Sequence, residues 1–201
     1  MLVFHVEDLM KKILIISAFV LGLTGCGIRK IPTALNQVEA SWAEVVNQYQ
    51  RRSDLIPNLV ATVEGAKNFE KDTLTAVVQA RASATNTNVS FDKLNDQTMA
   101  QFQRAQDSLG SSLSRLMVVV EKYPELKATE NFLALQSQIE GAENRIAVAR
   151  NRFIESVKVY NTFLSVPPES WFNSAFYHYE KKPQFVVTNL EQIEKAPQVK
   201  F

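Results

Sequence analysis

The feature that most constrains this chain is a run over residues 129–165 in which apolar side chains recur at alternating spacings of three and four. Such spacing places these side chains along one face of an α-helix, where they form a single seam for a neighbouring helix. The seam consists of Phe132, Leu135, Ile139, Ala142, Ile146, Ala149, Phe153, Ser156, Tyr160 and Phe163. Its regularity predicts left-handed, coiled-coil-like packing within a helical bundle.

Two earlier segments show the same period. Residues 96–122 carry two apolar rows at heptad spacing, and residues 36–84 carry a longer and less regular seam. The polar residues 83–90 predict a loop between these segments, and Pro124 predicts a short turn before the third helix. A short turn makes neighbouring helices antiparallel. The sequence therefore predicts an all-α fold, an antiparallel up-and-down bundle of three long helices followed by a short C-terminal segment.

The composition is that of a globular protein, with 46% hydrophobic residues and a formal net charge of +1. This balance gives no electrostatic surface for nucleic acid or for anionic lipid. About 175 residues follow residues 1–25, which is enough for one domain with its own core. Cys26 is the single cysteine, so no disulfide joins parts of that domain and its stability has to come from packing.

The N-terminal residues have the layout of an export signal. Lys11 and Lys12 precede an apolar run over residues 13–23, and residues 23–26 read Leu-Thr-Gly-Cys, which is a lipobox. A helix over the apolar run would be about 16 Å long, roughly half the thickness of a bilayer core. Cleavage of a signal peptide before Cys26 is therefore favoured over an uncleaved membrane-spanning anchor.

Cleavage would leave Cys26 as the attachment point for a diacylglyceryl group and palmitate, and two or three acyl chains anchor a protein stably. Gly27 follows it, where an aspartate would resemble the inner-membrane retention signal of Gram-negative bacteria. We expect a lipid-anchored envelope protein, on the periplasmic face of a Gram-negative outer membrane or on the outer face of a Gram-positive plasma membrane. Acidic residues near Met1 do not suit an export signal, so translation is expected to start at Met10, with Met1 as the alternative.

One charged residue interrupts the seam of the first helix. Arg52 lies at seam spacing, and nearby Pro57 is expected to bend the helix because its ring clashes with the carbonyl of Ser53. Charged side chains also flank the third seam, namely Glu140, Glu143, Arg145, Arg150 and Arg152. If the two stretches face each other, they form a partly buried ionic network in which Arg52 pairs with Glu143 or Glu140 and fixes helix register.

Nothing in this pattern requires catalysis. Glu140 and Glu143 share a helix face, as a general acid and base would, but nearby arginines would keep both carboxylates ionised. A structural network is the more common reason for such spacing. His178 has no cysteine or histidine at metal-ligand spacing, and no serine lies in a nucleophile elbow. The sequence therefore predicts no catalytic residue, no cofactor and no metal site.

Several runs resemble the signature segments of the LemA family of bacterial envelope proteins. They are residues 47–59, 80–82, 123–128 and 138–152. The resemblance extends from about Glu39 to Phe201 and implies a helical bundle outside the cytoplasm, beyond one N-terminal membrane anchor. It implies no activity. Two positions depart from the family: Ala142 replaces a frequent threonine, and residues 27–30 lack the tyrosine and asparagine often found after the anchor.

Aromatic residues cluster after the third helix, at Trp171, Phe172, Phe176, Tyr177 and Tyr179. In a three-helix bundle anchored at its first helix, the third helix ends far from the membrane. The aromatics are then expected to cap the bundle or to fold onto the seam of the first helix, and to be poor candidates for the interface of the anchoring bilayer. A docking surface for a partner protein is the alternative.

These expectations give four segments: a signal peptide at 1–25, a lipidated tether at 26–35, a helical bundle at 36–166, and an aromatic segment at 167–201 packed on the bundle. The predicted function is that of a non-catalytic scaffold or adaptor, held on the membrane through Cys26, that binds another envelope protein. The alternatives are a purely structural envelope lipoprotein and an enzyme with an unrecognised site.

Overall fold

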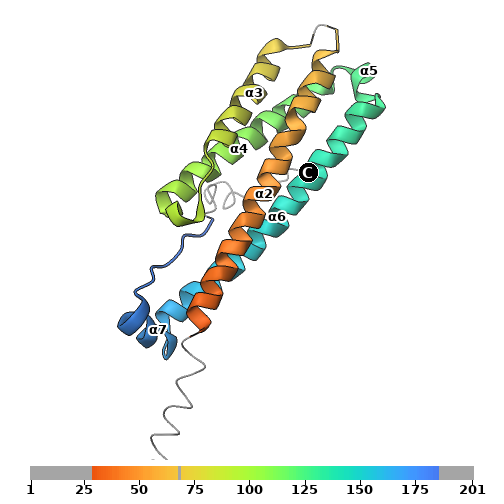
Figure 1. Cartoon of the computed structure of the whole chain (residues 1–201). Helices are drawn as coiled ribbons and strands as arrows, with labels where there is room; N and C mark the ends of the chain where they lie inside the picture. Colours follow the sequence, from red (N-terminus) through yellow and green to blue (C-terminus); the bar gives the residue numbers. More distant parts are fainter. Residues whose placement is uncertain (1–28, 68, 186–201) are drawn as a thin grey trace, which may run out of the picture. The chain divides into compact units, whose positions relative to one another are not determined.

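The computed structural model describes residues 29–67 and 69–185, which form helices and turns without a strand (Figure 1). The predicted signal peptide and Cys26 lie outside the described residues. The elements are α2 (Lys30–Glu64), α3 (Lys71–Asn86), the 3₁₀ turn η1 (Phe91–Lys93), α4 (Asp96–Val120), α5 (Pro124–Lys127), α6 (Glu130–Ser165), α7 (Glu169–Phe172) and the π-turn η2 (Asn173–Tyr177). The prediction of an all-α helical bundle is confirmed.

The described chain divides into two compact units, and both α2 and α6 run through the two of them. The larger unit contains residues 41–67, 69–154 and 183–185, and the smaller unit contains residues 29–40 and 155–182. In the larger unit α2 and α4 run in one direction and α3 and α6 in the other (Figure 1).

The prediction of one long helix over residues 36–84 is wrong, because the chain turns back after α2 to form α3. α2 ends directly before Gly65, a residue type with low helix propensity. The amide of Ala66 then donates to the Val63 carbonyl at 3.0 Å. Phe69 packs on Tyr123, with ring centroids 4.9 Å apart. Over residues 29–67 and 69–185 the bundle therefore has four long helices, α2, α3, α4 and α6, instead of the predicted three.

α2 begins at Lys30, inside the segment predicted as a tether. Ile31 and Ala34 are buried and continue the seam toward Val38 at spacings of three and four. Pro32 is compatible with this start because the amides of a first helical turn have no partner within the helix. The seam of the first helix is therefore longer than its sequence pattern suggested.

The predicted seams form the core. On α2 every seam position is buried: Val38, Trp42, Val45, Tyr49, Arg52, Ile56, Leu59 and Val63. On α6, Val157 is fully buried and Ser156 is only half-buried, because a straight helix drifts relative to a strict heptad. In the larger unit the Trp42 ring lies 5.2 Å from Phe102 and 5.3 Å from Phe153 between centroids.

Arg81 of α3 supplies a hydrogen bond that Pro57 removes from α2. Pro57 lies inside α2 and has no amide hydrogen to donate to the carbonyl of Ser53, four residues earlier. The Arg81 Nε–H donates to that carbonyl at 2.9 Å. The Ser53 hydroxyl also lies 3.1 Å from the Thr85 hydroxyl of α3. The position expected to disturb α2 is thus where α3 is attached to it.

In the smaller unit, Lys30 at the start of α2 pairs with Glu169 at the start of α7, with Nζ and Oε1 2.6 Å apart. The Tyr160 hydroxyl donates to the Glu180 carbonyl at 3.0 Å. The expectation that the last long helix ends far from the start of the first is therefore wrong. An even number of antiparallel helices returns the chain to the end where it began, and α3 makes the number even.

The Arg81 contact predicts coupling between two positions. Arg81→Met should destabilise the protein by about 1–2 kcal/mol, because the Ser53 carbonyl loses its donor. In a Pro57→Ala background the loss should be smaller, because the restored amide at position 57 can donate to the same carbonyl. Urea unfolding of the four proteins measures this coupling. Arg104→Met, which removes an exposed arginine from α4, is the control, and additive effects of Arg81→Met and Pro57→Ala would contradict the account.

The Lys30–Glu169 pair predicts a pH dependence. The hydrogen bond from Lys30 lowers the pKa of Glu169 below its ordinary value of 4.5. The pair should therefore stabilise the fold above pH 4.5, and this contribution should be lost as the pH falls through the lower folded-state pKa. The Tm difference between wild type and Glu169→Gln should be constant near neutrality and vanish in acid. Glu155→Gln, which removes an exposed pair with Lys158, should show little difference at any pH.

Candidate functional site

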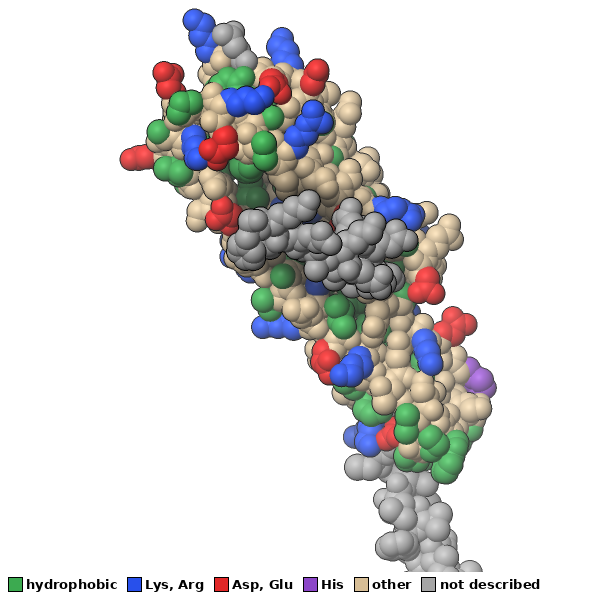
Figure 2. Space-filling view, turned by 180° about the vertical axis from the view of Figure 1, so that it is seen from behind, with side chains coloured by type: hydrophobic (Ala, Val, Ile, Leu, Met, Phe, Trp, Pro, Cys, Tyr) green, Lys and Arg blue, Asp and Glu red, His purple; other side chains and the backbone are tan. Residues whose placement is uncertain are grey.

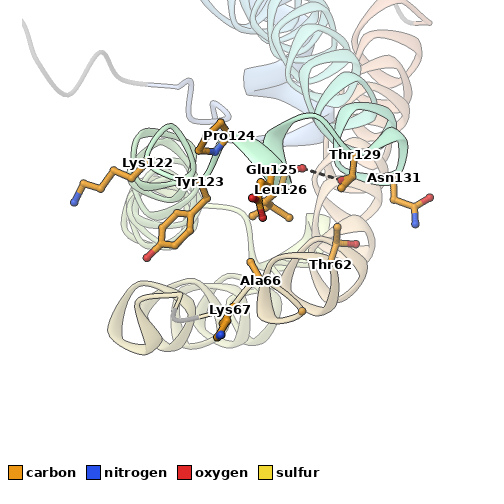
Figure 3. Close-up of a pocket in the computed structure, with 11 residues that line it drawn as sticks. Thr62, Ala66, Lys67, Lys122, Tyr123, Pro124, Glu125, Leu126, Thr129 and Asn131 are labelled. Atoms are coloured by element: carbon orange, nitrogen blue, oxygen red, sulfur yellow. Dashed lines mark hydrogen bonds between the residues drawn. The ribbon is translucent and has the colours of Figure 1, made fainter.

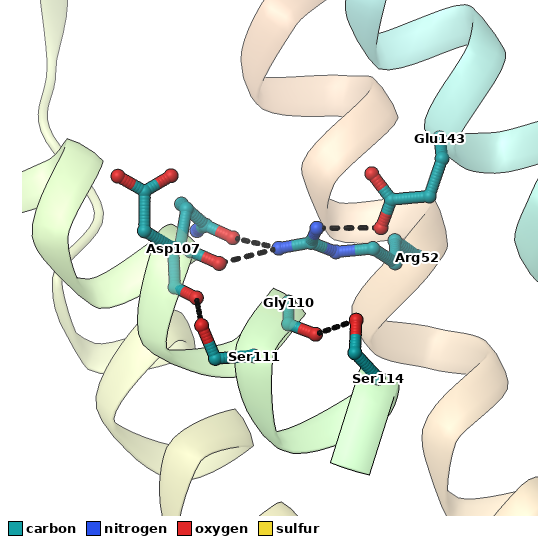
Figure 4. A network of polar contacts seen from close by, with 7 residues as sticks. Arg52, Asp107, Gly110, Ser111, Ser114 and Glu143 are labelled. Carbon is teal, nitrogen blue, oxygen red and sulfur yellow. Dashed lines mark hydrogen bonds and ion pairs between the residues drawn. The ribbon is translucent and has the colours of Figure 1, made fainter. Parts of the chain in front are cut away.

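The centre of the larger unit holds a buried cation. Arg52 of α2 is 3% exposed, and its Nη1 donates to Glu143 Oε1 of α6 at 2.7 Å (Figure 4). Its Nη2 donates to the side-chain oxygen of Gln106 on α4 at 2.8 Å and to the Gln106 backbone carbonyl at 3.1 Å. The guanidinium also lies 5.1 Å from the centroid of the Tyr49 ring. The guanidinium of Arg52 thus joins α2 to both α4 and α6.

The polar contacts around Arg52 extend to α3. The Gln106 side-chain amide donates to the Ala84 carbonyl at 3.4 Å, and the hydroxyls of Ser53 and Thr85 lie within hydrogen-bond distance. Together with the Arg81 contact, these bonds form a polar layer that joins α2, α3, α4 and α6. We call this set, Arg52, Ser53, Arg81, Thr85, Gln106 and Glu143, the polar layer. It replaces apolar packing at one level of the bundle.

The structure brings together only part of the predicted ionic network. Arg52 and Glu143 are paired, whereas Glu140 accepts a hydrogen bond from Gln136 along α6 at 2.9 Å. The exposed Arg145 folds over Gly141, where a Cβ would lie 3.6 Å from its guanidinium nitrogens. Arg150 lies over the ring of Phe185, 4.5 Å from the centroid. Each of these three groups therefore has its own local contact.

Gln106 was not among the predicted site residues, although its position in the sequence indicates a buried polar contact. It stands at heptad spacing between the buried Met99 and Leu113, so a polar side chain occupies an apolar row. Such a residue needs a buried partner. Its partner, Arg52, interrupts the apolar seam of another helix in the same way, and two polar interruptions on facing seams predict that they meet.

Tyr49 lies beside the buried guanidinium of the polar layer. Burial raises the pKa of Tyr49, with Arg150 and Arg52 opposing the shift, so its phenol is neutral at physiological pH. The guanidinium of Arg52 carries only N–H donors and accepts no hydrogen bond. Among residues 29–67 and 69–185, no group of three His, Cys, Asp or Glu side chains is placed to hold a metal ion. The arrangement holds the Arg52 guanidinium between acceptors of α4 and α6.

A hollow of about 710 Å³ lies where the connection between α2 and α3 meets the α4–α5 turn (Figure 3). Its lining includes Thr62, Ala66, Tyr123, Leu126 and Thr129. The Thr129 hydroxyl donates to the Leu126 carbonyl at 2.8 Å, which holds the turn that forms one wall. One wall of the hollow is therefore formed by residues 123–128, one of the runs that resemble signature segments of the LemA family.

A groove of about 620 Å³ runs between α4 and α6 and adjoins the polar layer. Its α4 side consists of Gly110, Leu113, Ser114 and Met117, and its α6 side of Gln136, Ile139, Glu140, Glu143 and Asn144. The Ser114 hydroxyl donates back to the Gly110 carbonyl at 3.0 Å, so this side chain stays close to its own helix (Figure 4). Small residues on α4 leave the groove open, and an apolar floor lies beneath a carboxylate edge.

The family model for the LemA family matches residues 41–201, which is most of the chain. The chain belongs to the LemA family. The match includes the described residues of the larger unit, and with them the hollow, the α4–α6 groove and the polar layer. No helix in the part of this LemA protein that the structure describes combines the length and the apolar character needed to span a bilayer.

Two curated proteins are similar to parts of this LemA chain. "Magnetosome protein MamQ" of Magnetospirillum gryphiswaldense is 29% identical over 83 residues, 38% of this chain and 30% of that protein. "Protein LemA" of Metamycoplasma hominis is 28% identical over 118 residues, 58% of this chain and 50% of that protein. The matched span thus covers half or less of each relative, and what those proteins do does not transfer from the match.

The polar layer predicts coupling between Arg52 and Glu143. Arg52→Met should destabilise this LemA protein by about 1–3 kcal/mol, because Gln106 and its carbonyl lose their donor. A double-mutant cycle with Glu143→Gln should give a coupling of about 1 kcal/mol, moderated by the 44% exposure of the Glu143 side chain. Urea unfolding measures both values. Glu140→Gln on the same helix should show no coupling to Arg52, and an equal coupling there would contradict the assignment.

Proposed function

We propose that this LemA protein is a lipid-anchored, non-catalytic adaptor that binds a helix of another envelope protein in the α4–α6 groove. The observation that carries the proposal is the groove itself. It combines an open apolar floor with a carboxylate edge, whereas the polar layer beneath it uses its hydrogen bonds to join the helices. In this proposal the groove is the binding surface, and the buried guanidinium of Arg52 joins the helices.

The floor of the groove suits the apolar face of a helix. Leu113 and Ile139 are buried at its base, and Met117 beside them is a flexible side chain that adapts to varied partners. Gly110 and Ser114 take up little space, so a partner backbone can approach α4 closely. An amphipathic helix laid into such a groove is a recurring mode of protein recognition.

The edge of the groove indicates the charge of the partner. Glu140 is exposed, and the Glu143 side chain is 44% exposed although Arg52 holds one of its oxygens. Two carboxylates one helical turn apart favour a partner with lysine or arginine beside its apolar residues. The proposed partner is therefore a basic amphipathic helix.

The anchor in this proposal is the acylated thiol of Cys26. The Leu-Thr-Gly-Cys run after a short apolar segment supports it, and so does the position of α2, which begins only four residues after that cysteine. The proposed location is the cell envelope, with the protein on the periplasmic face of an outer membrane or on the outer face of a plasma membrane.

Site-specific photo-crosslinking in native membranes tests the adaptor role. Crosslinkers placed at Ser114 and at Asn144 should both capture the same membrane protein, whereas one at Gln79 on α3, an exposed position outside the groove, should not. Glu140→Lys should lower the yield from both groove positions, because it reverses a charge at the edge without touching the core. Equal capture from all three positions, or none from any, would favour a purely structural lipoprotein.

Fractionation tests the anchor separately. Cys26→Ser should move the protein from the membrane to the soluble fraction, and mass spectrometry of the wild-type protein should find acyl chains on residue 26. A Cys26→Ser protein that stays membrane-bound after signal cleavage would contradict lipid anchoring, whatever the crosslinking shows.

A further inference from the structure

The smaller unit exposes large apolar side chains where the chain leaves α6. Trp171 is 68% exposed, Phe176 is 71% exposed and Val166 is 50% exposed. We call these three residues the aromatic patch. Hydrophobic side chains gather on the surface over α7 and η2 in the space-filling view (Figure 2). Exposed tryptophan and phenylalanine side chains so close together in the sequence indicate a binding surface.

The backbone around the patch is held in place by its own hydrogen bonds. The Asn173 side chain donates to the Tyr179 carbonyl at 3.0 Å and accepts from the Tyr179 amide at 2.9 Å. The rings of Tyr177 and Tyr179 stack with centroids 5.3 Å apart. His178 between them adopts a left-handed conformation, with φ 56°. The aromatic segment therefore has a defined shape instead of forming an extended tail.

The start of α2 ties this surface to the proposed anchor. Lys30 pairs with Glu169, two residues before Trp171, and its ammonium lies 5.9 Å from the ring centroid of Phe163. Cys26 precedes Lys30 by four residues, so their α-carbons are at most about 14 Å apart in an extended chain. An acyl chain on Cys26 would bring the beginning of α2, and α7 beside it, to the bilayer.

We infer that the aromatic patch inserts into the interfacial region of the membrane that holds the anchor. This inference rests on the proposed lipid attachment at Cys26. Tryptophan favours the headgroup level, because its ring is apolar and its N–H can still bond to water or lipid. Arg29 and Lys181 are exposed in the same unit and supply cations for lipid phosphates. The lipid and the patch together would fix the orientation of the unit on the membrane.

The size of the patch favours a lipid surface over a protein partner. An aromatic side chain buries about 150–250 Å², so three apolar side chains fall short of the roughly 800 Å² per partner of a stable protein interface. A membrane interface needs no matching surface, and a few aromatic residues beside an acyl anchor are sufficient.

Tryptophan fluorescence provides the test, because the chain has two tryptophans in contrasting environments. Trp42 is 2% exposed and Trp171 is 68% exposed. The mature, lipidated protein is placed in vesicles of phosphatidylethanolamine and phosphatidylglycerol, with or without bromine on the acyl chains. Brominated lipid should quench part of the emission. Trp171→Phe should remove most of that quenching, because the remaining Trp42 lies in the core.

A second variant tests whether the loss of quenching comes from lost membrane insertion or from a change in folding. Phe176→Ser should leave the thermal unfolding curve nearly unchanged, since the ring is exposed, but should reduce the quenching of Trp171. Val78→Ser, which replaces an exposed valine on α3 in the larger unit, is the matched control and should leave the quenching unchanged.

The outcomes separate the patch from the anchor. If wild-type protein floats with the vesicles but brominated lipid does not quench Trp171, the patch inference is wrong and the anchor stands. If Cys26→Ser floats as well as wild type, the anchor proposal is wrong, whether or not Trp171 is quenched. An emission shift of Trp171 that depends on protein concentration without vesicles would assign the patch to a second copy of the chain and would overturn the inference.

Discussion

The larger unit depends on how the guanidinium of Arg52 is accommodated within an apolar seam. A buried charge without partners is strongly unfavourable, so the helices around Arg52 must present acceptors at one level. Gln106 of α4 and Glu143 of α6 do so. A shift of either helix by one turn would move its acceptor about 5 Å away, whereas apolar side chains would tolerate many such shifts. We therefore expect the ion pair to select one register among several packings, as the double-mutant cycle tests.

The same level of the bundle contains the point where α2 lacks a backbone hydrogen bond. Arg81 of α3 donates to the Ser53 carbonyl that Pro57 leaves without its helical donor. The two arginines have complementary roles. Arg52 has buried N–H donors that need acceptors, whereas Arg81 donates to a Ser53 carbonyl that needs a donor. The Nη atoms of Arg52 and the Ser53 carbonyl find these partners within the chain, whereas the buried Nε–H of Arg52 has no hydrogen-bond partner among the described residues.

The proposed function rests on two surface features, one in each unit. The α4–α6 groove offers an apolar floor and two carboxylates, and the smaller unit exposes Trp171 and Phe176 near the start of α2. Membership of the LemA family agrees with this helical framework and assigns no reaction to it. In the proposal, the lipid and the aromatic patch orient the smaller unit on the membrane, and the groove of the larger unit binds a helix of another envelope protein.

The period of three and four predicted most of the core positions on α2, α4 and α6, because it fixes a helix face without knowledge of its partner; it missed Ile31, Ala34 and Val157. The sequence also predicted that Arg52 would meet an acid on the third seam. The end of α2 at Glu64 and the reversal into α3 could not be predicted from the apolar pattern, since Gly65 is tolerated within helices and the contact of Phe69 with Tyr123 exists only in the folded chain. Within the smaller unit, the opposite directions of α2 and α6 bring Glu169 to Lys30. Likewise Arg150 lies over Phe185 and not in the ionic network, because the cation contacts whichever group the fold places nearest.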